Sequence, residues 1–530
     1  MLRPIIVCFA LACVADARDP VRLRAYPQKF RESRLAVDYS PPPALSREAV
    51  MPPLGDVTTT AITSDGAVWI GTRSGLMRFD AKADPLDRWQ YFGGRRYLDD
   101  DEVVGLVPSG TGVWVRTKTG TSHIRLEPMT LLRKAEYFHR RVVERHDRYG
   151  LVAGSRLREP GNLATNQLSP NDNDGLWTAM YAAAECFRYA VTRSGQALAR
   201  ARKSTEAVLF LEQVTGRPGF PARSYIRKGD FRGSDGVWHW TPDGAIEWKA
   251  DTSSDEIVGH FYLFGVAWDL LPDQALKDRI AATARRIMDH ILANGYHLTD
   301  INGQPTYWGR WSPEYFATPR GKPDSPLNAL ELLSFLKTTA HITGDARYDA
   351  EYRKVAFEMK YLEIMTHLDR LRTVINYSDE ELAMLPFYLI FRYERDPQML
   401  VTYRKALDQW WQNMRREKNP LWTFIYAVAN PGRDADLAGA VWTLQRIPMD
   451  LINWTVRNSH RKDVVMAPSI DRFKRPQSET LLPADERPIM KWNSNPFVID
   501  GGGNGNSEDD GAFFLLPYWM GRHHRLLLGE

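Results

Sequence analysis

A chain of 530 residues is too long for one hydrophobic core, because cores stop growing near about 250 to 300 residues, so we expect at least two modules. Its 69 Lys and Arg against 65 Asp and Glu leave a formal charge of only +4. This balance excludes nucleic acid or an anionic membrane as the main partner. Any anionic ligand must be bound by local groups of basic residues.

The first 17 residues have the composition of a cleavable secretory signal. Arg3 precedes an apolar run over residues 5–15, and Ala15-Asp16-Ala17 is a small-residue cleavage motif. The run is shorter than the about 20 apolar residues of a membrane-spanning helix, and no later segment is long and uncharged enough to span. We predict a secreted or periplasmic protein without a membrane span. A lipoprotein attached at Cys13 is the weaker alternative.

Residues 18–127 are predicted to hold an N-terminal segment and a module of β repeats. Residues 57–80 and 103–126 share the order apolar strand, glycine turn, Val-Trp-[Ile/Val], glycine turn, apolar strand. The first copy, with DGAVWIGT followed by GLMRF, resembles the blades of two-component-regulator propellers, and the second copy loses the Gly-Leu step. Two blades cannot close a propeller of about four to eight blades, so we expect the module to pack on the C-terminal domain.

From residue 128 to residue 530 the hydrophobic period is helical, and apolar segments alternate with charged amphipathic ones. An α/α toroid requires this alternation, because its inner helices are covered on both sides while its outer helices face water. We predict a mainly α fold: an (α/α) toroid catalytic domain of about six helix pairs, preceded by the small β module. The apolar helices are expected near 175–192, 256–271, 326–342, 379–392 and 436–455, and the amphipathic ones near 200–214, 274–293, 346–359 and 396–417.

An acidic or amide-rich stretch precedes each apolar helix. Helix capping explains most of these side chains, and Ser253 with Glu256 has capping-box spacing. If the apolar helices form the inner ring, however, all their N-termini lie on one rim, lined by hydrogen-bonding groups and the positive ends of helix dipoles. The stretches are NDNDG (171–175), SSDE (253–256), DSP (324–326), NYSDE (376–380) and NSEDDG (506–511).

Two long connections on that rim, residues 217–249 and 296–320, are rich in aromatic and basic residues. Connections of this length without a helix are uncommon unless they are functional. Indole rings suit the apolar face of a sugar, and guanidinium groups suit the carboxylate of a uronate. The predicted substrate-binding residues of the connections and the rim are Arg232, Trp238, Trp240, Trp308, Trp311 and Tyr377.

His260 lies in an otherwise apolar segment, WKADTSSDEIVGHFYLFGVAWDLL, which covers residues 248–271. It follows Glu256 by one helical turn, so both side chains can face the rim. A buried, hydrogen-bonded core histidine is the alternative. We favour a functional role because the polar rim and the aromatic connections converge on the same place.

The segments NDNDGLWTAMYAAAECFRYA, SSDEIVGHFYLFGVAWDL and FLLPYWMGRHH, behind propeller-like repeats, resemble the toroid polysaccharide lyases, and among them bacterial lyases that remove rhamnose from glucuronate. The resemblance implies β-elimination on a uronate-containing oligo- or polysaccharide. In that reaction a base removes the C5 proton, an acid protonates the leaving oxygen, and the carboxylate is neutralised. The resemblance matches no catalytic position, so position on the rim assigns His260 as base, Tyr315 as acid or alternative base, and Arg310 with Asn173 as the neutralising pair.

Two other functions fit the same sequence. A glycoside hydrolase of the (α/α) barrel type needs two carboxylic acids, and the rim offers several, among them Asp255 and Asp379. The regulator-type repeats suggest a non-enzymatic glycan sensor or binding protein instead. No cofactor is expected to be required and no catalytic metal site is predicted, although NDNDG or NSEDDG could hold a structural calcium. The sequence does not determine the oligomeric state.

Overall fold

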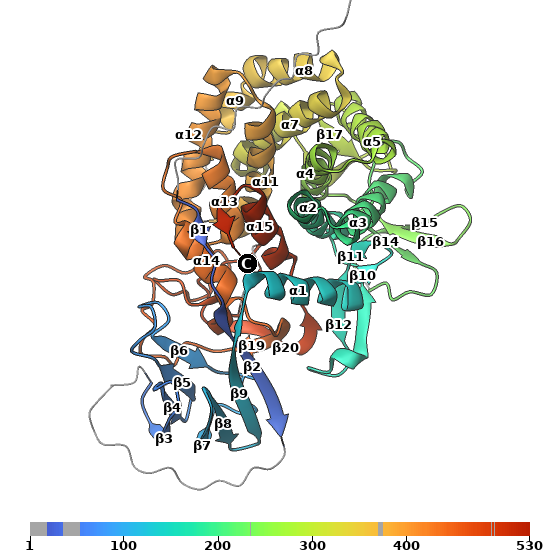
Figure 1. Ribbon diagram of the computed structural model, residues 1–530. Helices are drawn as coiled ribbons and strands as arrows, with labels where there is room; N and C mark the ends of the chain where they lie inside the picture. The colour runs from blue at the N-terminus through green and yellow to red at the C-terminus, as the bar shows by residue number, and fades with distance from the viewer. Residues whose placement is uncertain are drawn as a thin grey trace, which may run out of the picture.

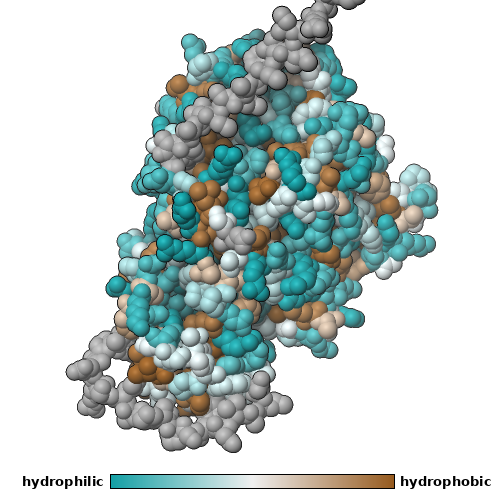
Figure 2. Space-filling model, in the orientation of Figure 1, coloured by the Kyte–Doolittle hydropathy of each residue, from teal (hydrophilic) through white to brown (hydrophobic). Residues whose placement is uncertain are grey.

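The computed structural model describes residues 19–34 and 54–529, apart from residues 234, 369–374, 489 and 492. The predicted signal peptide lies outside the described residues. The chain forms a β module and a large helical part (Figure 1). Within the described ranges, every helix is too short or too polar to cross a membrane. Hydrophilic residues cover most of the face shown in Figure 2, and the apolar patches on it are scattered.

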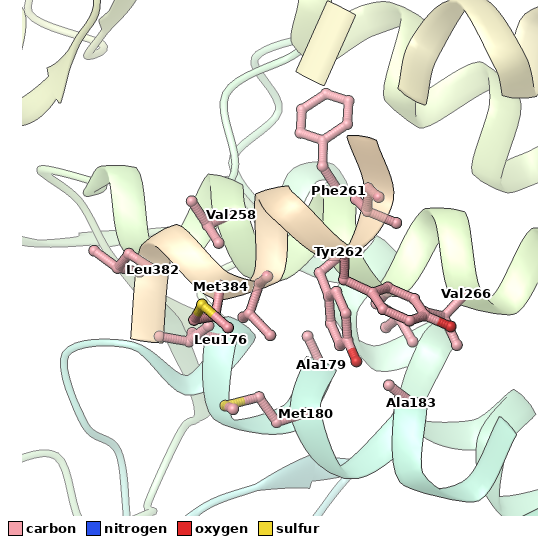
Figure 3. Close-up of a cluster of buried hydrophobic side chains, with 14 of the residues drawn as sticks. Leu176, Ala179, Met180, Ala183, Val258, Phe261, Tyr262, Val266, Leu382 and Met384 are labelled. Carbon is pink, nitrogen blue, oxygen red and sulfur yellow. The ribbon is translucent and has the colours of Figure 1, made fainter. Parts of the chain in front are cut away.

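Six apolar helices of the described chain contact one another in a closed cyclic order. In the order of contact they are α2 (Asp174–Thr192), α4 (Ser254–Leu270), α7 (Gly321–Thr343), α11 (Tyr377–Tyr393), α13 (Pro420–Ala429) and α15 (Ala512–His523), which contacts α2 again. Side chains of α2, α4 and α11 meet in one buried cluster, where Met180, Tyr262 and Met384 lie close together (Figure 3). We call these six the inner helices.

A second set of helices packs on the outside of this cycle, and we call them the outer helices. Each contacts one or two inner helices, and all except α14, which is almost entirely buried, keep a polar face toward solvent. They are α1 (Leu131–Arg145), α3 (Gly195–Gln213), α5 (Gln274–Ala293), α8 (Ala346–Arg353), α12 (Pro397–Met414) and α14 (Leu437–Arg446). Inner and outer helices therefore alternate along the chain.

The segment predicted as one apolar helix over residues 436–455 is two elements. Helix α14 ends two residues before Pro448, and strand β19 (Ile452–Val456) follows. Proline cannot continue a helix and disfavours helical backbone in the residue before it, while β-branched residues suit a strand. The inner helix of this region is α13, which the prediction missed although Asn419-Pro420 is a helix-start signal.

Strands occupy the two long connections of the rim. The first connection holds a sheet in the order β14-β16-β15, and the second holds the hairpin β17-β18 and a short helix α6. Another sheet, in the order β13-β12-β20-β19, lies between the helical part and the β module in Figure 1. The bounds are β12 (Gly154–Leu157), β13 (Asn166–Ser169), β14 (Ser224–Arg227), β15 (Trp238–Trp240), β16 (Ile246–Lys249), β17 (His297–Thr299), β18 (Pro305–Arg310), α6 (Pro313–Phe316) and β20 (Gly501–Glu508).

The β module consists of two four-stranded antiparallel sheets in contact with each other. One has the order β3-β4-β5-β6, and in the other, β2-β9-β8-β7, strand β2 pairs with β9 along its whole length. Trp69, Phe92 and Leu106 are buried in the core that the two sheets share. The strands are β2 (Tyr26–Arg34), β3 (Val57–Ile62), β4 (Val68–Thr72), β5 (Gly75–Phe79), β6 (Trp89–Phe92), β7 (Val103–Ser109), β8 (Gly112–Thr117) and β9 (Thr121–Met129).

A buried cluster of charges joins the β module to the helical part. Arg446 of α14 forms ion pairs with Asp87 at 2.7 Å, Asp485 at 2.8 Å and Glu486 at 2.9 Å. Lys29 of β2 forms a further pair with Asp485 at 2.5 Å. Because the Arg446 side chain is only 1% exposed, these charges depend on one another rather than on water. The module thus packs on the helical part, as its open edges led us to expect.

Replacing Arg446 with methionine should destabilise the protein strongly, because Asp87 loses its ion pair while Asp485 and Glu486 keep only Lys29 and Arg461. Removing one partner of a buried ion pair costs about 3–5 kcal/mol. Urea unfolding followed by tryptophan fluorescence should show this loss. Arg433→Met, which removes an exposed pair with Asp408, should cost about 1 kcal/mol or less. An Arg446→Met protein as stable as the wild type would show that the cluster does not hold the module.

Candidate active site at the N-terminal rim of the inner helices

The N-termini of the inner helices lie close together, and we call this end of the cycle the rim. At the start of α2, the Gly175 amide donates a hydrogen bond to the Glu256 carboxylate of α4 at 3.1 Å. The charge of Asp379, in the first turn of α11, acts on Asp255 in the first turn of α4. Burial raises the pKa of Glu331 of α7, and the negative charges of the same two aspartates raise it further. Two cavities continue the rim across α13, α15 and α2.

Inner and outer helices differ in how their N-termini are capped. Each outer helix begins with a side chain that accepts a hydrogen bond from its own first turn. Among the described inner helices, α13 alone is capped by its own N-cap residue; the first turns of α2, α7 and α15 donate instead to the side chains of Glu256, Thr318 and Asp510. A side-chain cap contributes about 1 kcal/mol. At five helices of the rim, therefore, the N-cap residue does not supply this stabilisation, and the acceptors present come from other positions.

The capping box predicted for Ser253 and Glu256 does not form. The Ser253 hydroxyl instead donates to the Asn173 side-chain oxygen at 3.0 Å, and Glu256 accepts from α2 rather than from its own helix. Asn173 in turn donates through Nδ2 to Asp255 at 2.8 Å. The polar residues of the rim therefore bind one another across helices, and helix capping does not account for them.

Asp255 has the properties of a proton-transfer group. Its side chain is partly exposed although protein atoms surround most of it. Burial, together with the negative charge of Asp379, raises the pKa of Asp255 to about 6, against the opposing effects of Arg223 and Asn173. A carboxyl group that changes protonation near neutral pH and still meets solvent can donate or accept a proton in a reaction.

Other carboxyl groups of the rim are also affected by burial. Burial raises the pKa of Glu417, which precedes α13, to about 7, and it raises the pKa of Asp509, which precedes α15. The pKa values of Glu256 and Glu331 lie well above the usual range for the same reason. Because these last two side chains are fully buried, we regard them as structural groups that hold the rim together.

The predicted base His260 does not lie on the rim. Its side chain is fully buried, Nδ1 donates to the backbone oxygen of Glu256 at 2.6 Å, and its ring packs edge-on against Phe264. Burial lowers the pKa of His260 to about 4, so the ring is neutral. The ring faces Val208 and Glu212 of the outer helix α3. In a helix buried all round, the spacing from Glu256 does not reveal which side chains point to the rim.

The other three predicted catalytic residues do lie at the rim. Asn173 contacts Asp255, and the Tyr315 hydroxyl donates to Asp324 of α7 at 3.2 Å. Burial raises the pKa of Tyr315 to about 12, so its hydroxyl stays protonated and suits a proton donor rather than a base. The Arg310 guanidinium lies 5.9 Å from the Tyr315 ring and donates through Nε to the Thr306 backbone oxygen at 2.7 Å.

Four of the predicted substrate-binding residues are accessible. Trp240 is 51% exposed and Trp308 is 45% exposed, each on a hairpin beside the rim. Trp238 is half-buried, and the exposed Arg232 guanidinium lies 5.8 Å from its ring. The Arg320 guanidinium lies 4.7 Å from the Trp308 ring. These side chains give the rim an aromatic and basic border.

Trp311 and Tyr377, by contrast, are core residues in this structure. Trp311 is fully buried, and its Nε1 donates to Glu331 at 2.7 Å. Tyr377 is 9% exposed, and burial raises its pKa. Neither residue offers a ring face to a ligand, so the substrate-binding role predicted for them has no structural support. The sequence places both next to polar rim residues but does not show that their rings point inward.

The two cavities of the rim share Lys491, whose Nζ lies 4.3 Å from the Trp177 ring. The larger one, of about 190 Å³, includes Asn171, Trp177, Asp509 and Asp510 in its lining, and the recess of about 20 Å³ includes Glu417, Asn419, Arg487 and Phe513. Sequence reasoning missed Arg487 and Lys491, because they lie in a long connection without helical or strand periodicity. Their only sequence signal is their charge.

Within the described residues, no group of three or more His, Cys, Asp or Glu side chains is arranged to hold a metal ion. In the NDNDG stretch, Asp174 is bound to Arg148 at 2.5 Å, and Asp172 pairs with Lys249. Asp174 Oδ2 and Asp172 Oδ1 therefore already have partners. Calcium binding at this stretch or at NSEDDG stays a prediction.

No family model and no curated protein matches the chain. Among solved structures, it is similar to a metagenome-derived glycoside hydrolase family 9 endoglucanase, with a TM-score of 0.43 and 12% identity over 88% of this chain and 92% of that chain. It is also similar to a sugar epimerase from a ruminal bacterium, with a TM-score of 0.36 and 11% identity over 74% of this chain and 99% of that chain. A family 76 glycoside hydrolase from a bovine Bacteroides thetaiotaomicron strain gives a TM-score of 0.24 and 11% identity over 67% of this chain and 90% of that chain. Similarity at this level assigns neither fold nor activity.

Replacing Asp255 with asparagine should stabilise the folded protein near neutral pH. The raised pKa means that ionisation of Asp255 costs folding free energy, so this carboxyl favours folding below about pH 4 and loses that contribution as pH rises through about 6. Asparagine avoids the cost and keeps an oxygen for Asn173. The free energy of unfolding should rise by about 1–3 kcal/mol at about pH 7.5 and be unchanged at about pH 4. A variant less stable than the wild type at neutral pH would contradict the raised pKa.

Proposed function

We propose that this chain is a secreted glycan-cleaving enzyme with an α/α toroid, whose catalytic centre is the rim. The closed cycle of inner helices inside a set of outer helices supports the toroid. The signal-like first 17 residues support export. The observation that carries the function is Asp255, a partly exposed carboxyl group with a pKa of about 6 under the influence of Asp379.

Glycoside hydrolysis is the reaction that these carboxyl groups support best. One carboxyl donates a proton to the glycosidic oxygen, and an ionised one activates water or attacks the sugar. Asp255, protonated below about pH 6, fits the acid. Asp379 is partly exposed and its negative charge acts on Asp255, which fits the base or nucleophile. Asn173 orients the Asp255 carboxyl through its 2.8 Å hydrogen bond.

β-Elimination, the reaction implied by the sequence resemblance, is the second candidate. Tyr315 favours it, because its protonated hydroxyl at the rim suits the acid that the leaving oxygen requires. With His260 buried, the ionised form of Asp255 would have to remove the C5 proton. The two reactions therefore require opposite protonation states of the same carboxyl group.

The border of the rim supports a sugar polymer as the substrate. Exposed indole rings such as Trp240 and Trp308 contribute contact area and bind sugars through their flat faces. A glycan sensor would use the same aromatic border. A glycan sensor does not need a carboxyl group whose pKa lies near neutral pH, whereas an enzyme can use such a group for proton transfer. We therefore propose an enzyme.

The pH dependence of cleavage should distinguish the two reactions. If Asp255 is the acid of a hydrolase, kcat/KM falls as pH rises through about 6; if it is the base of a lyase, kcat/KM rises over the same range. Asp255→Asn should lower kcat by about 10²- to 10⁴-fold in either case. The assay measures new reducing ends and unsaturated-uronate absorbance on a panel of neutral and uronate-containing glycans.

Asp278→Asn, which changes an exposed aspartate of the outer helix α5, is the matched control and should retain wild-type activity. New reducing ends without ultraviolet absorbance would establish hydrolysis, and absorbance would establish elimination. If Asp255→Asn cleaves every glycan as fast as the wild type, the rim is not the catalytic centre.

A further inference from the structure

Arg223 lies between the two chain segments that lead into the inner helices α2 and α4. It directly precedes β14, and its side chain is buried. Its Nε donates to the backbone oxygen of Asp251 at 2.6 Å, and its Nη1 donates to that of Asp172 at 3.0 Å. The planar guanidinium group presents several donors in fixed directions, so one side chain holds the backbone just before both helices.

The side-chain amide of Asn173 connects Arg223 to Asp255. Arg223 Nη1 donates to the Asn173 oxygen at 3.4 Å, and the Ser253 hydroxyl donates to the same oxygen at 3.0 Å. On its other side, Asn173 Nδ2 donates to Asp255 at 2.8 Å. A guanidinium group can only donate and an ionised carboxyl group can only accept, so the amide satisfies both only in this orientation. Held with its NH₂ group toward Asp255, the amide favours the ionised carboxyl.

The backbone at Asp251, which Arg223 Nε contacts, has an uncommon conformation. Its φ of 54° lies in the left-handed region, which residues other than glycine rarely adopt. The Asp251 amide donates to Asp300 at 3.0 Å, and the Asp251 carboxylate accepts from the Tyr307 amide at 2.7 Å. Strained backbone of this kind persists where the surrounding structure requires one geometry. Arg223 and the hairpin β17-β18 thus hold the segment before α4 in a single position.

Four charged or titratable groups face Asp255 from the helices and the connection around it. Burial raises the pKa of Asp255, the positive charge of Arg223 lowers it, and the negative charge of Asp379 of α11 raises it. Glu256 of α4 and Glu331 of α7 also interact with Asp255. Burial keeps the pKa values of these two glutamates well above the usual range, so they are protonated near neutral pH. Arg223 is therefore the group among the four that opposes burial.

We propose that Arg223 is a positioning residue of the rim: acting through Asn173, it fixes the direction of the Asp255 carboxyl group and favours its ionised form. The catalytic consequence rests on the proposed function, whereas the arrangement rests on the hydrogen bonds of Asn173. When Asp255 gives its proton to the glycosidic oxygen, Arg223 and Asn173 stabilise the carboxylate that remains.

Carbon NMR of the full chain with labelled aspartate measures the titration of Asp255, and the spectrum of Asp255→Asn identifies its signal. The midpoint of the wild type should lie at about pH 6. Arg223→Met should raise this midpoint by about one pH unit or more, because it removes a neighbouring positive charge and a donor to Asn173. Arg227→Met, which removes an exposed cation of the strand β14, should leave the midpoint unchanged.

The Asn173→Leu background distinguishes the hydrogen-bonded arrangement from the charge of Arg223 alone. Without the amide, Arg223→Met should raise the midpoint by less than it does in the wild-type background, because the two side chains act together. Equal shifts in both backgrounds would overturn the role of Asn173. If Arg223→Met does not fold, Arg223→Gln, which keeps amide donors without the charge, should move the midpoint in the same direction.

An unchanged midpoint in a folded variant of Arg223 would overturn the proposal. The inflection of kcat/KM against pH should move together with the midpoint, a change that a merely structural role of Arg223 would not produce. If the wild type cleaves a glycan through Asp255 while Arg223→Met leaves the midpoint in place, this inference falls and the proposed function stands. A midpoint that moves in a protein without glycan cleavage gives the reverse outcome.

Discussion

A helix that neighbouring helices cover on every side can present polar groups to solvent only at its ends. This constraint determines where the chemistry of the molecule lies. The inner helices bury nearly all their side chains, so acids such as Asp255 and Asp379 lie in their first turns. Because the N-termini meet at one rim, residues far apart in the sequence act on one another there. On five of these helices the N-cap residue makes no capping hydrogen bond, and at α2 the Glu256 carboxylate of the neighbouring helix α4 accepts from the first turn instead.

Two groups of charges in the molecule illustrate the difference between a structural and a functional arrangement. At the border with the β module, Arg446 binds three carboxylates, so each buried charge has a partner. At the rim, burial raises the pKa of Asp255 and lowers that of Arg487, and the described chain supplies no ion pair for either. Near neutral pH the shift leaves part of the Asp255 carboxyl protonated, whereas Arg487 stays charged.

Hydrophobic periodicity predicted most of the helices, because the buried face of a helix produces a regular spacing of apolar residues over many positions. The inner helices α2, α4, α7 and α11 and the outer helices α3, α5, α8 and α12 lie where the pattern placed them. The pattern failed over residues 436–455, where one proline ends a helix, and it missed the short helix α13. Single side chains were harder to predict. His260 and Trp311 are residue types that are common in binding sites. Whether their side chains point to the rim or into the core depends on packing between helices, which the sequence of one helix does not show. Arg487 lies in an irregular connection, and only the folded chain shows that it is buried.

The most direct test of the rim as the catalytic centre is a crystal structure of the Asp255→Asn protein with a bound glucuronate-containing oligosaccharide. The sugar should lie across the N-termini of the inner helices, with a glycosidic oxygen within hydrogen-bond distance of residue 255. The cleft of about 330 Å³ between the β module and the helical part, which Arg95 and Trp454 line, offers another place for a glycan. An oligosaccharide bound in that cleft with no sugar at the rim would contradict the assignment.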